Sequence, residues 1–462
     1  MTYRVIALGC QMNISDSERV ASVLQGAGYR EAEREEDADI LGVVACSVRQ
    51  KAIDRIYSKI HEWNGWKAQR PLLTFVSGCI LPEDERKFLR LFDLVFRIDD
   101  LPRLPELVRT YGVPVPVPSG VEPQRSVTLQ HADDFWAIAP RYQSPHAAYV
   151  PIQNGCDKFC TFCAVPYTRG REVSRPAADI LGEVTRLVEN GYRTITLLGQ
   201  NVNSYGKGLG DAGSAAGTPA FPTFAELLDE VGDVADTAAH RVWVYFTSPH
   251  PSDMSGDVLD AIAAHPSLAK QVHLPLQSGD DRVLIRMNRN YRLEDYRKIV
   301  GDIRDRLPTA TLFTDLIVGF CGETEEQFAA TREAMEEFRY HMAFIAAYSP
   351  RPGAAGSRWD DDVPQSEKKR RLHVLSEVLQ RTALAHHERQ VGATVDVFVE
   401  AEDRQPGLLL ARTEGRIPVR LAGDAALVGS IVPATVTAAR PLSLAAELSA
   451  AHTLAAAPAA AG

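Results

Sequence analysis

The chain has 462 residues, of which 45% are hydrophobic and 24% are charged. This length and composition suit two or three globular domains and exclude a chain that is disordered throughout. The sequence holds no run of about eighteen apolar residues and no signal peptide, so we expect a soluble, cytoplasmic protein without a membrane partner. Because the net charge is −10, a nucleic acid would have to be bound by a local basic surface.

Short apolar runs alternate with amphipathic stretches over residues 1–113, which predicts a parallel, doubly wound α/β domain. Three of these runs lead into a cysteine at or just past the predicted carboxyl end of a strand: Cys10, Cys46 and Cys79. The carboxyl ends of parallel strands share one edge of the sheet, so the three thiols should converge there. The alternative is that each cysteine is a small buried apolar side chain.

Residues 114–145 are rich in proline and polar residues and are predicted to be a linker. The next domain, residues 146–390, begins with six strand–helix units and ends in a long charged helix over 365–390. Six such units fit a partial TIM-type barrel better than an open sheet. A glycine-rich stretch at 206–219 is predicted to be a flexible insertion.

The pattern changes again at residue 391. Short alternating strands separated by turn residues over 391–446 predict a small β-barrel of the kind that binds oligonucleotides. The alanine-rich end, residues 447–462, is predicted to lack packed structure.

Seven cysteines are an odd number, and a cytoplasmic chain of this size has no need of disulfides, so metal or redox chemistry is the first hypothesis. Cys156, Cys160 and Cys163 form a CxxxCxxC motif after the first predicted barrel strand. Three thiolates suit a 4Fe–4S cube and leave one iron open to a substrate. The alternative is a zinc site completed by a distant His or Cys.

A CxxxCxxC motif after the first strand of a partial barrel resembles the radical S-adenosylmethionine (SAM) superfamily. Further motifs extend the resemblance over nearly the whole chain: GCDKFCTFCAVPYTRGREVSRP, LLGQNVNSYG, FTSPHP, HLPLQSGDD, GETEEQF and YSPRPG. Together with a terminal barrel that resembles a TRAM domain, they are similar to the methylthiotransferases. YTRGREVSRP and LGQNVN are most similar to the MiaB branch, whose members modify tRNA.

The resemblance implies two 4Fe–4S clusters and SAM as cofactors. Carried over residue by residue, Cys156, Cys160 and Cys163 match the ligands of the cluster that binds SAM, and Cys10, Cys46 and Cys79 match the ligands of an auxiliary cluster. Cys321 departs from the family pattern, which has proline at that place. We interpret it as a small side chain in a turn, with an adventitious ligand or a redox-sensitive thiol as alternatives.

Several residues are candidates for contact with SAM. Phe162 matches the position that the superfamily places near the adenine of SAM. Polar residues in or after the predicted barrel strands should in part face the cofactor at the carboxyl rim: Gln200, Asn201, Ser248, Gln277 and Asp315. A structural hydrogen bond is the alternative for each. His250 and His273 also fall near strand ends, and we expect both to be structural.

Two sets of arginines are candidates for RNA binding. Arg169, Arg171 and Arg175 follow the cysteine loop and could meet the SAM carboxylate or an RNA phosphate, or form ion pairs with Glu172 and its neighbours. Arg412, Arg416 and Arg420 form a basic stripe in the predicted terminal barrel, where such barrels bind single-stranded RNA.

The resemblance implies conversion of N6-isopentenyladenosine, beside the tRNA anticodon, to its 2-methylthio derivative. Separate proteins would donate electrons, iron–sulfur units and sulfur, and we expect a monomer. Two alternatives share the chemistry: methylthiolation of N6-threonylcarbamoyladenosine in tRNA, or of an aspartate on a ribosomal protein. A third is a non-catalytic iron–sulfur protein that binds RNA.

Overall fold

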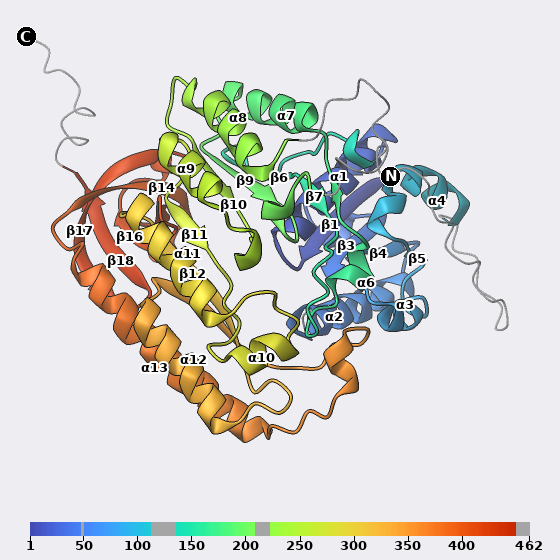
Figure 1. The fold of residues 1–462 in the computed structure, drawn as a ribbon. Coiled ribbons are helices and arrows are strands. Elements are labelled where there is room, and N and C mark those ends of the chain that lie inside the picture. The colour runs from blue at the N-terminus through green and yellow to red at the C-terminus, as the bar shows by residue number, and fades with distance from the viewer. Residues whose placement is uncertain (48–49, 112–134, 208–221, 450–462) are drawn as a thin grey trace, which may run out of the picture.

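The computed structural model describes residues 1–47, 50–111, 135–207 and 222–449. They form three domains in chain order, with the N-terminal domain and the C-terminal barrel on opposite sides of a central barrel (Figure 1). Most of the predicted linker, most of the predicted insertion and the end of the alanine-rich segment lie outside the described residues. Within the described part of the chain, no helix is long and apolar enough to cross a membrane.

The N-terminal domain is built on a five-stranded parallel sheet in the order β2-β1-β3-β4-β5. Its central strands β3 and β4 are buried along their whole length, as expected for a sheet covered on both faces. The strands are β1 (Thr2–Leu8), β2 (Arg30–Glu31), β3 (Ile40–Cys46), β4 (Leu73–Cys79) and β5 (Leu94–Val95).

Helices cover both faces of this sheet, which confirms the predicted doubly wound domain. Val20 and Leu24 of α1 pack in one apolar cluster with residues of α4, whereas Ile56 and Trp63 of α2 pack in another with α3. The elements are α1 (Gln11–Gly26), η1 (Glu35–Asp37), α2 (Gln50–Lys67), α3 (Pro82–Phe88), η2 (Ile98–Arg103) and α4 (Leu104–Tyr111).

Six parallel strands form the central barrel in two groups, β10-β9-β6 and β11-β12-β13. A parallel bridge from Val244 to Leu268 connects the groups. This arrangement confirms the predicted partial TIM-type barrel. The strands are β6 (Ala147–Pro151), β9 (Thr194–Leu198), β10 (Trp243–Phe246), β11 (Gln271–His273), β12 (Thr311–Val318) and β13 (Met342–Ala347).

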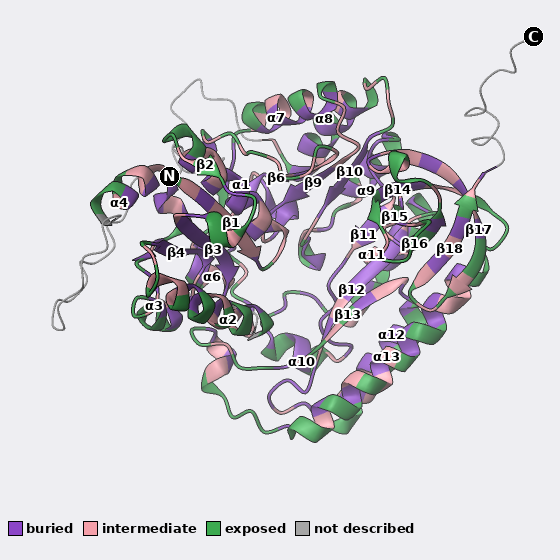
Figure 2. Ribbon diagram, turned by 180° about the vertical axis from the view of Figure 1, so that it is seen from behind, coloured by how far each residue is buried: buried purple, intermediate pink, exposed green. Residues whose placement is uncertain are grey.

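Helices surround these strands and bury one apolar face each, while their outer faces remain exposed (Figure 2). The longest, α13 (Gln365–Glu388), packs on β13 and α12 and reaches the C-terminal barrel. The others are α7 (Ala177–Glu189), α8 (Phe224–Asp236), α9 (Gly256–Ala264), α10 (Asp281–Arg286), α11 (Leu293–Arg306) and α12 (Glu325–Phe338). Short elements at the rim are β7 (Gln153–Asn154), α6 (Val165–Arg169), β8 (Val173–Ser174), η3 (Val202–Ser204), η4 (Pro251–Asp253) and η5 (Ala355–Arg358).

The C-terminal domain is a closed barrel in the order β14-β15-β16-β18-β17. The prediction that packed structure ends before residue 447 is wrong, because β18 closes the barrel through Leu448. Leu444 and Ala446 point into its core, a period-two pattern that the high alanine content hides. The elements are β14 (Thr394–Glu402), β15 (Leu408–Thr413), β16 (Pro418–Ala422), η6 (Ala425–Leu427), β17 (Ile431–Arg440) and β18 (Ser443–Leu448).

The turn between β15 and β16 inserts into the amino-terminal end of the central barrel. The Arg416 guanidinium lies 4.0 Å from the centre of the Tyr245 ring and donates to Thr196 Oγ1 at 2.7 Å. The carbonyl oxygen of Gly415 accepts from Thr311 Oγ1 at 2.8 Å, and Glu414 Oε1 accepts from the Lys270 amide at 2.9 Å. We call residues 414–416 the floor turn, because they contact β9, β10 and β12 near their starts.

Candidate iron–sulfur and cofactor site

The structure brings Cys10, Cys46 and Cys79 together at the carboxyl edge of the N-terminal sheet, and we call them the N-terminal triad. Cys46 and Cys79 are register partners at the ends of β3 and β4. Cys10 lies two residues beyond β1, whose last residue, Leu8, pairs with Ala45. Convergence follows from the parallel register, as the sequence predicts.

Asn13, on the first turn of α1, connects members of this triad. Its Oδ1 accepts from the Cys10 amide at 3.2 Å and lies 3.5 Å from Cys10 Sγ. Its Nδ2 donates to the Ala45 carbonyl at 3.1 Å and lies 4.0 Å from Cys79 Sγ. A hydrogen bond with Cys46, together with burial, raises the pKa of the Cys79 thiol. The thiols therefore lie within one small polar cluster.

Cys156, Cys160 and Cys163, the central triad, lie on the loop that follows β7. Gly155 starts this loop with φ of +81°, and a Cβ there would lie 2.0 Å from the Arg171 carbonyl oxygen, so only glycine fits. The Cys163 amide donates to the Cys160 carbonyl at 3.0 Å, which folds the CxxC segment into a turn. Burial raises the pKa of Cys156 to about 11 and that of Cys163 to about 12.

Among the described residues, no three His, Cys, Asp or Glu side chains could hold a single metal ion. Each thiolate ligand of a four-iron cube binds a different iron, so this finding concerns a mononuclear site and not a cluster.

A buried arginine accompanies each triad. Arg169, at the end of α6, donates from Nε to Cys79 Sγ at 3.0 Å and from Nη1 to Asn154 Oδ1 at 3.1 Å. Arg289 donates from Nη1 to Cys160 Sγ at 3.3 Å. A cation that hydrogen-bonds a sulfur favours the thiolate, which is the form that binds iron. Arg169 also links the N-terminal triad to the segment that carries the central triad, because α6 follows Cys163 and Asn154 precedes the central loop.

Asn201 Oδ1 and His250 Nε2 are buried polar atoms near the central loop that lack a hydrogen-bond partner among the described residues. Asn201 Nδ2 donates to Asp253, which forms an ion pair with Lys158 of the cysteine loop. Burial, with Arg289 and Lys158 adding to it, lowers the pKa of His250 to about 2, so its ring is neutral. Since an unpaired buried polar atom costs about 1–3 kcal/mol, a polar ligand bound here would remove that cost. The donor set therefore fits a cluster and the polar groups of SAM.

The other predicted cofactor residues lie around the same rim. Gln200 Oε1 accepts from the Gly155 amide at 2.5 Å and so fixes the start of the cysteine loop. Ser248 and Gln277 follow their strands with positive φ of 60° and 71°. His273 Nε2 lies 2.9 Å from Asp315 Oδ2.

Phe162 and Cys321 share one apolar cluster with Phe320 and Tyr348. Cys321 is 4% exposed and lies in the loop that follows β12, as its interpretation as a small side chain in a turn requires. Burial raises the pKa of its thiol.

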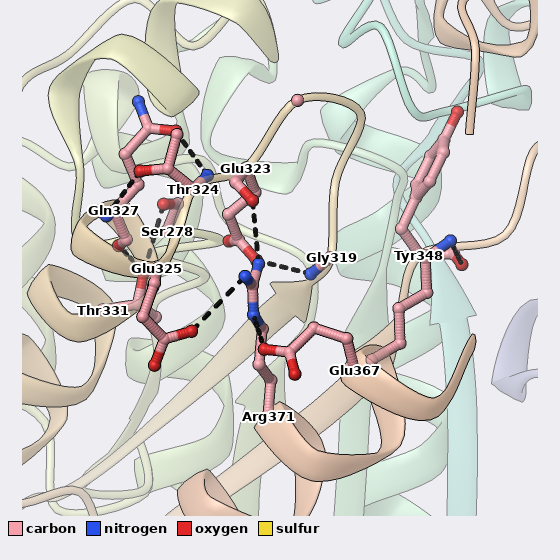
Figure 3. Close-up of polar contacts among 12 residues, drawn as sticks. Ser278, Gly319, Glu323, Thr324, Glu325, Gln327, Thr331, Tyr348, Glu367 and Arg371 are labelled. Atoms are coloured by element: carbon pink, nitrogen blue, oxygen red, sulfur yellow. Dashed lines mark hydrogen bonds and ion pairs between the residues drawn. The ribbon is translucent and has the colours of Figure 1, made fainter. Parts of the chain in front are cut away.

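Beneath this loop lies a buried ion-pair network (Figure 3). Arg371 donates from Nη1 to Glu323 Oε2 at 2.7 Å and from Nε to Glu367 Oε1 at 2.8 Å. Glu323 Oε2 also accepts from the Gly319 amide at 2.6 Å. The network thus ties α13 to the loop that presents Cys321 and Phe320 to Phe162.

The arginine predictions need correction. Arg169 and Arg175 are each 4% exposed and form ion pairs with Asp16 and Glu183, so neither presents its guanidinium at the surface. Arg171 is exposed and pairs with Asp157 at 2.9 Å.

In the C-terminal barrel, Arg416 belongs to the floor turn and is half-buried against Tyr245 and Thr196, which corrects its assignment to the basic stripe. Arg412 and Arg420 are exposed and form ion pairs with Glu400 and Asp403.

Sequence reasoning missed Asn13, Asp16 and Arg289. Asn13 lies three residues after Cys10, at the spacing of a helix capping box, and that spacing was an available signal. Asp16 pairs with a residue 153 positions away, and Arg289 reaches a sulfur 129 positions away, so no local pattern marks either.

The chain is similar to known proteins over most of its length. Three family models match: Uncharacterized protein family UPF0004 over residues 2–97, the Radical SAM superfamily over 150–335 and the TRAM domain over 388–449. The tRNA-2-methylthio-N(6)-dimethylallyladenosine synthase of Geotalea uraniireducens is 38% identical over 95% of this chain and 97% of its own length. The enzyme of the same name from Symbiobacterium thermophilum is 40% identical over 95% and 93%.

Among solved structures, the radical S-adenosylmethionine methyltransferase TsrM from Kitasatospora setae has a TM-score of 0.52 at 15% identity, over 88% of this chain and 78% of its own. That likeness concerns the fold alone. Identity over nearly the whole length of the curated relatives is what establishes the family. The chain therefore belongs to the MiaB-type tRNA methylthiotransferases, radical SAM enzymes with a 4Fe–4S cluster and SAM as cofactors.

Proposed function

We propose that this enzyme methylthiolates C2 of N6-isopentenyladenosine beside the anticodon of tRNA. The observation that supports this proposal best is the presence of two cysteine triads, with Arg169 bonded both to Cys79 of the first and to Asn154, two residues before Cys156 of the second. One triad alone would suffice for radical generation, whereas a second is needed to hold sulfur for transfer. Relatives at 37–38% identity carry the name of this activity.

We propose the central triad as the ligand set of the cluster that binds SAM, and the N-terminal triad as the ligand set of a second 4Fe–4S cluster. When bound, these groups supply a radical that can abstract hydrogen and a sulfur that can be methylated. The protein's own residues orient and shield them. Asn201 and His250 offer the SAM polar groups two unpaired atoms, and Phe162 offers its adenine an apolar contact.

The remaining partners are also proposals. We assign Arg171, Arg412 and Arg420 to RNA binding, because their guanidinium groups are the exposed members of the two arginine sets. The reaction needs an electron donor and a source of iron–sulfur units and sulfur, which we propose to be separate proteins acting on a monomeric enzyme.

Three anaerobically reconstituted proteins test the ligand assignment. The wild type should hold about eight irons, from two four-iron clusters. Replacing the three cysteines of the central triad with Ala should abolish 5′-deoxyadenosine release from SAM. Replacing the N-terminal triad should spare that release and stop methylthiolation. Methylthio product from the second variant would refute the two-cluster proposal.

Substrate choice is tested with three otherwise matched tRNAs, whose target adenosine is bare, isopentenylated or threonylcarbamoylated. An apolar isopentenyl pocket should reject the charged threonylcarbamoyl group, whose burial without a partner is costly. Mass spectrometry of the nucleosides should find product from the isopentenylated tRNA. Preferential turnover of the threonylcarbamoylated tRNA would favour the alternative substrate.

A further inference from the structure

Three exposed side chains gather beside the central cysteine loop: Phe159, Tyr167 and Arg171. Phe159 is 37% exposed and Tyr167 is 43% exposed, and their rings meet edge to face with centroids 6.4 Å apart. The Arg171 guanidinium lies 5.3 Å from the centre of the Phe159 ring. We call these three residues the aromatic platform.

The backbone holds the platform in place at a cost. Phe159 has φ of +47°, a left-handed conformation that is costly for a bulky residue. The Asn288 amide stabilises it by donating to the carbonyl oxygens of Lys158 and Phe159 at 3.1 Å each. On the other side, Gly353 of the YSPRPG loop lies close to Tyr167. A Cβ placed on Gly353 would be 3.8 Å from the Tyr167 side chain, so this loop also borders the platform. The ring of Phe159 is therefore exposed by a fixed backbone and not by a loose loop.

Packing does not account for this exposure. Single exposed apolar residues are normal on protein surfaces, but two adjoining aromatic rings with a guanidinium over one of them form a patch. Such a combination binds single-stranded nucleic acid, because bases stack on aromatic faces while the cation attracts the phosphate backbone. The patch also lies within a few residues of Cys160 and Cys163.

We propose that the aromatic platform stacks a nucleobase adjacent to the target adenosine and so holds the loop open while the target enters the central barrel. The proposal rests on the proposed function, which makes the substrate a splayed RNA loop. Unstacking a base costs a few kcal/mol, and a neighbouring base that stacks on the Tyr167 ring, which Phe159 contacts edge to face, offsets part of that cost.

The test uses the reconstituted enzyme and a synthetic isopentenylated anticodon stem-loop. Tyr167→Leu should weaken RNA binding about fivefold or more, since stacking contributes about 1–3 kcal/mol per base. Tyr167→Phe should retain wild-type affinity, because it keeps the ring. Phe159 is left intact because it separates cysteines of the central triad.

Arg171→Gln should weaken binding about threefold or more and reduce its dependence on salt. Arg34→Gln is the matched control, because Arg34 is an exposed arginine paired to Asp37 near the opposite edge of the N-terminal sheet. It should bind RNA as the wild type does.

A stem-loop with 2-aminopurine beside the target adenosine reports stacking directly. Its fluorescence should be quenched by the wild type and by Tyr167→Phe, and much less by Tyr167→Leu. Affinity of Tyr167→Leu within twofold of the wild type would overturn the proposal. Unchanged RNA affinity with slower reduction by the electron donor would also overturn it and assign the patch to a protein partner. Failure of the wild type to form methylthio product would instead refute the proposed function.

Discussion

Arg416→Ala should loosen the joint between the C-terminal barrel and the central barrel. The guanidinium of the half-buried Arg416 lies 4.0 Å from the centre of the Tyr245 ring and donates to Thr196 Oγ1 at 2.7 Å. Ala cannot make either contact. We therefore expect a structural defect, in contrast to the loss of RNA affinity that an exposed arginine would give.

The magnitude follows from these contacts. A desolvated cation–π contact contributes about 2 kcal/mol, and a hydrogen bond from a charged donor about 1.5–3 kcal/mol. Burial lowers the pKa of Arg416, which shows that desolvation of the cation offsets part of that gain. We expect a net cost of about 2 kcal/mol, equivalent to about 30-fold in a local opening equilibrium.

Hydrogen exchange followed by mass spectrometry measures this opening. Amides of β10 and of the floor turn should exchange about 30-fold faster in Arg416→Ala. A double-mutant cycle with Tyr245→Leu should give a coupling of about 1–2 kcal/mol. Arg412→Ala is the control, since Arg412 is exposed on the same barrel and pairs with Glu400. It should leave exchange unchanged and weaken RNA binding. Unchanged exchange of β10 in Arg416→Ala, with weaker RNA binding, would refute the reasoning.

Three further predictions concern buried charges and pH. Arg169→Met should lower the stability of the N-terminal domain to urea by about 3–5 kcal/mol, because it leaves Asp16 buried without its cation; a shift below 1 kcal/mol would contradict this. Glu323→Ala should lower the free energy of unfolding by about 3 kcal/mol, because it leaves Arg371 buried without its anion. The double variant Glu323→Ala, Arg371→Met should recover part of that loss, as measured by the midpoint of urea unfolding. Burial lowers the pKa of His265, but hydrogen bonds to neighbouring carboxylates outweigh it and the net pKa is raised. The stability that protonated His265 contributes to the fold is therefore complete below its unfolded pKa and is lost as pH rises through its folded pKa. His265→Gln should lower the melting temperature more at acidic than at alkaline pH. A loss of melting temperature that grows with pH would contradict this assignment.

The sequence predicted those features that local pattern determines. Cys46 and Cys79 end apolar runs, and a parallel sheet necessarily brings such ends to one edge. The six strand–helix units and the closed C-terminal barrel are confirmed for the same reason, because each element shows its own periodicity.

The environment of the arginines could not be predicted in this way. Arg169, Arg175 and Arg416 look like exposed basic residues in the sequence. The burial of the first two and the half-burial of Arg416 depend on partners supplied by other elements. Asp16 and Tyr245, for example, lie 153 and 171 positions away from the arginines that they contact. The end of β18, residues 447 and 448, was missed for a different reason, since the small alanine at the inward position 446 gives only a weak apolar signal.

The floor turn also has a consequence for the order in which the chain is made. Trp243, Tyr245 and Phe313 pack against residues of the C-terminal barrel, all of which leave the ribosome after the central strands. At about 5–20 residues per second, the roughly one hundred residues from β13 to β18 take about 5–20 s to synthesise. During that interval the central barrel exists without its floor and exposes these aromatic side chains. A chain that stops short of β18 would keep them exposed, and its fate would be aggregation or degradation rather than a catalytically intact enzyme with weak RNA binding.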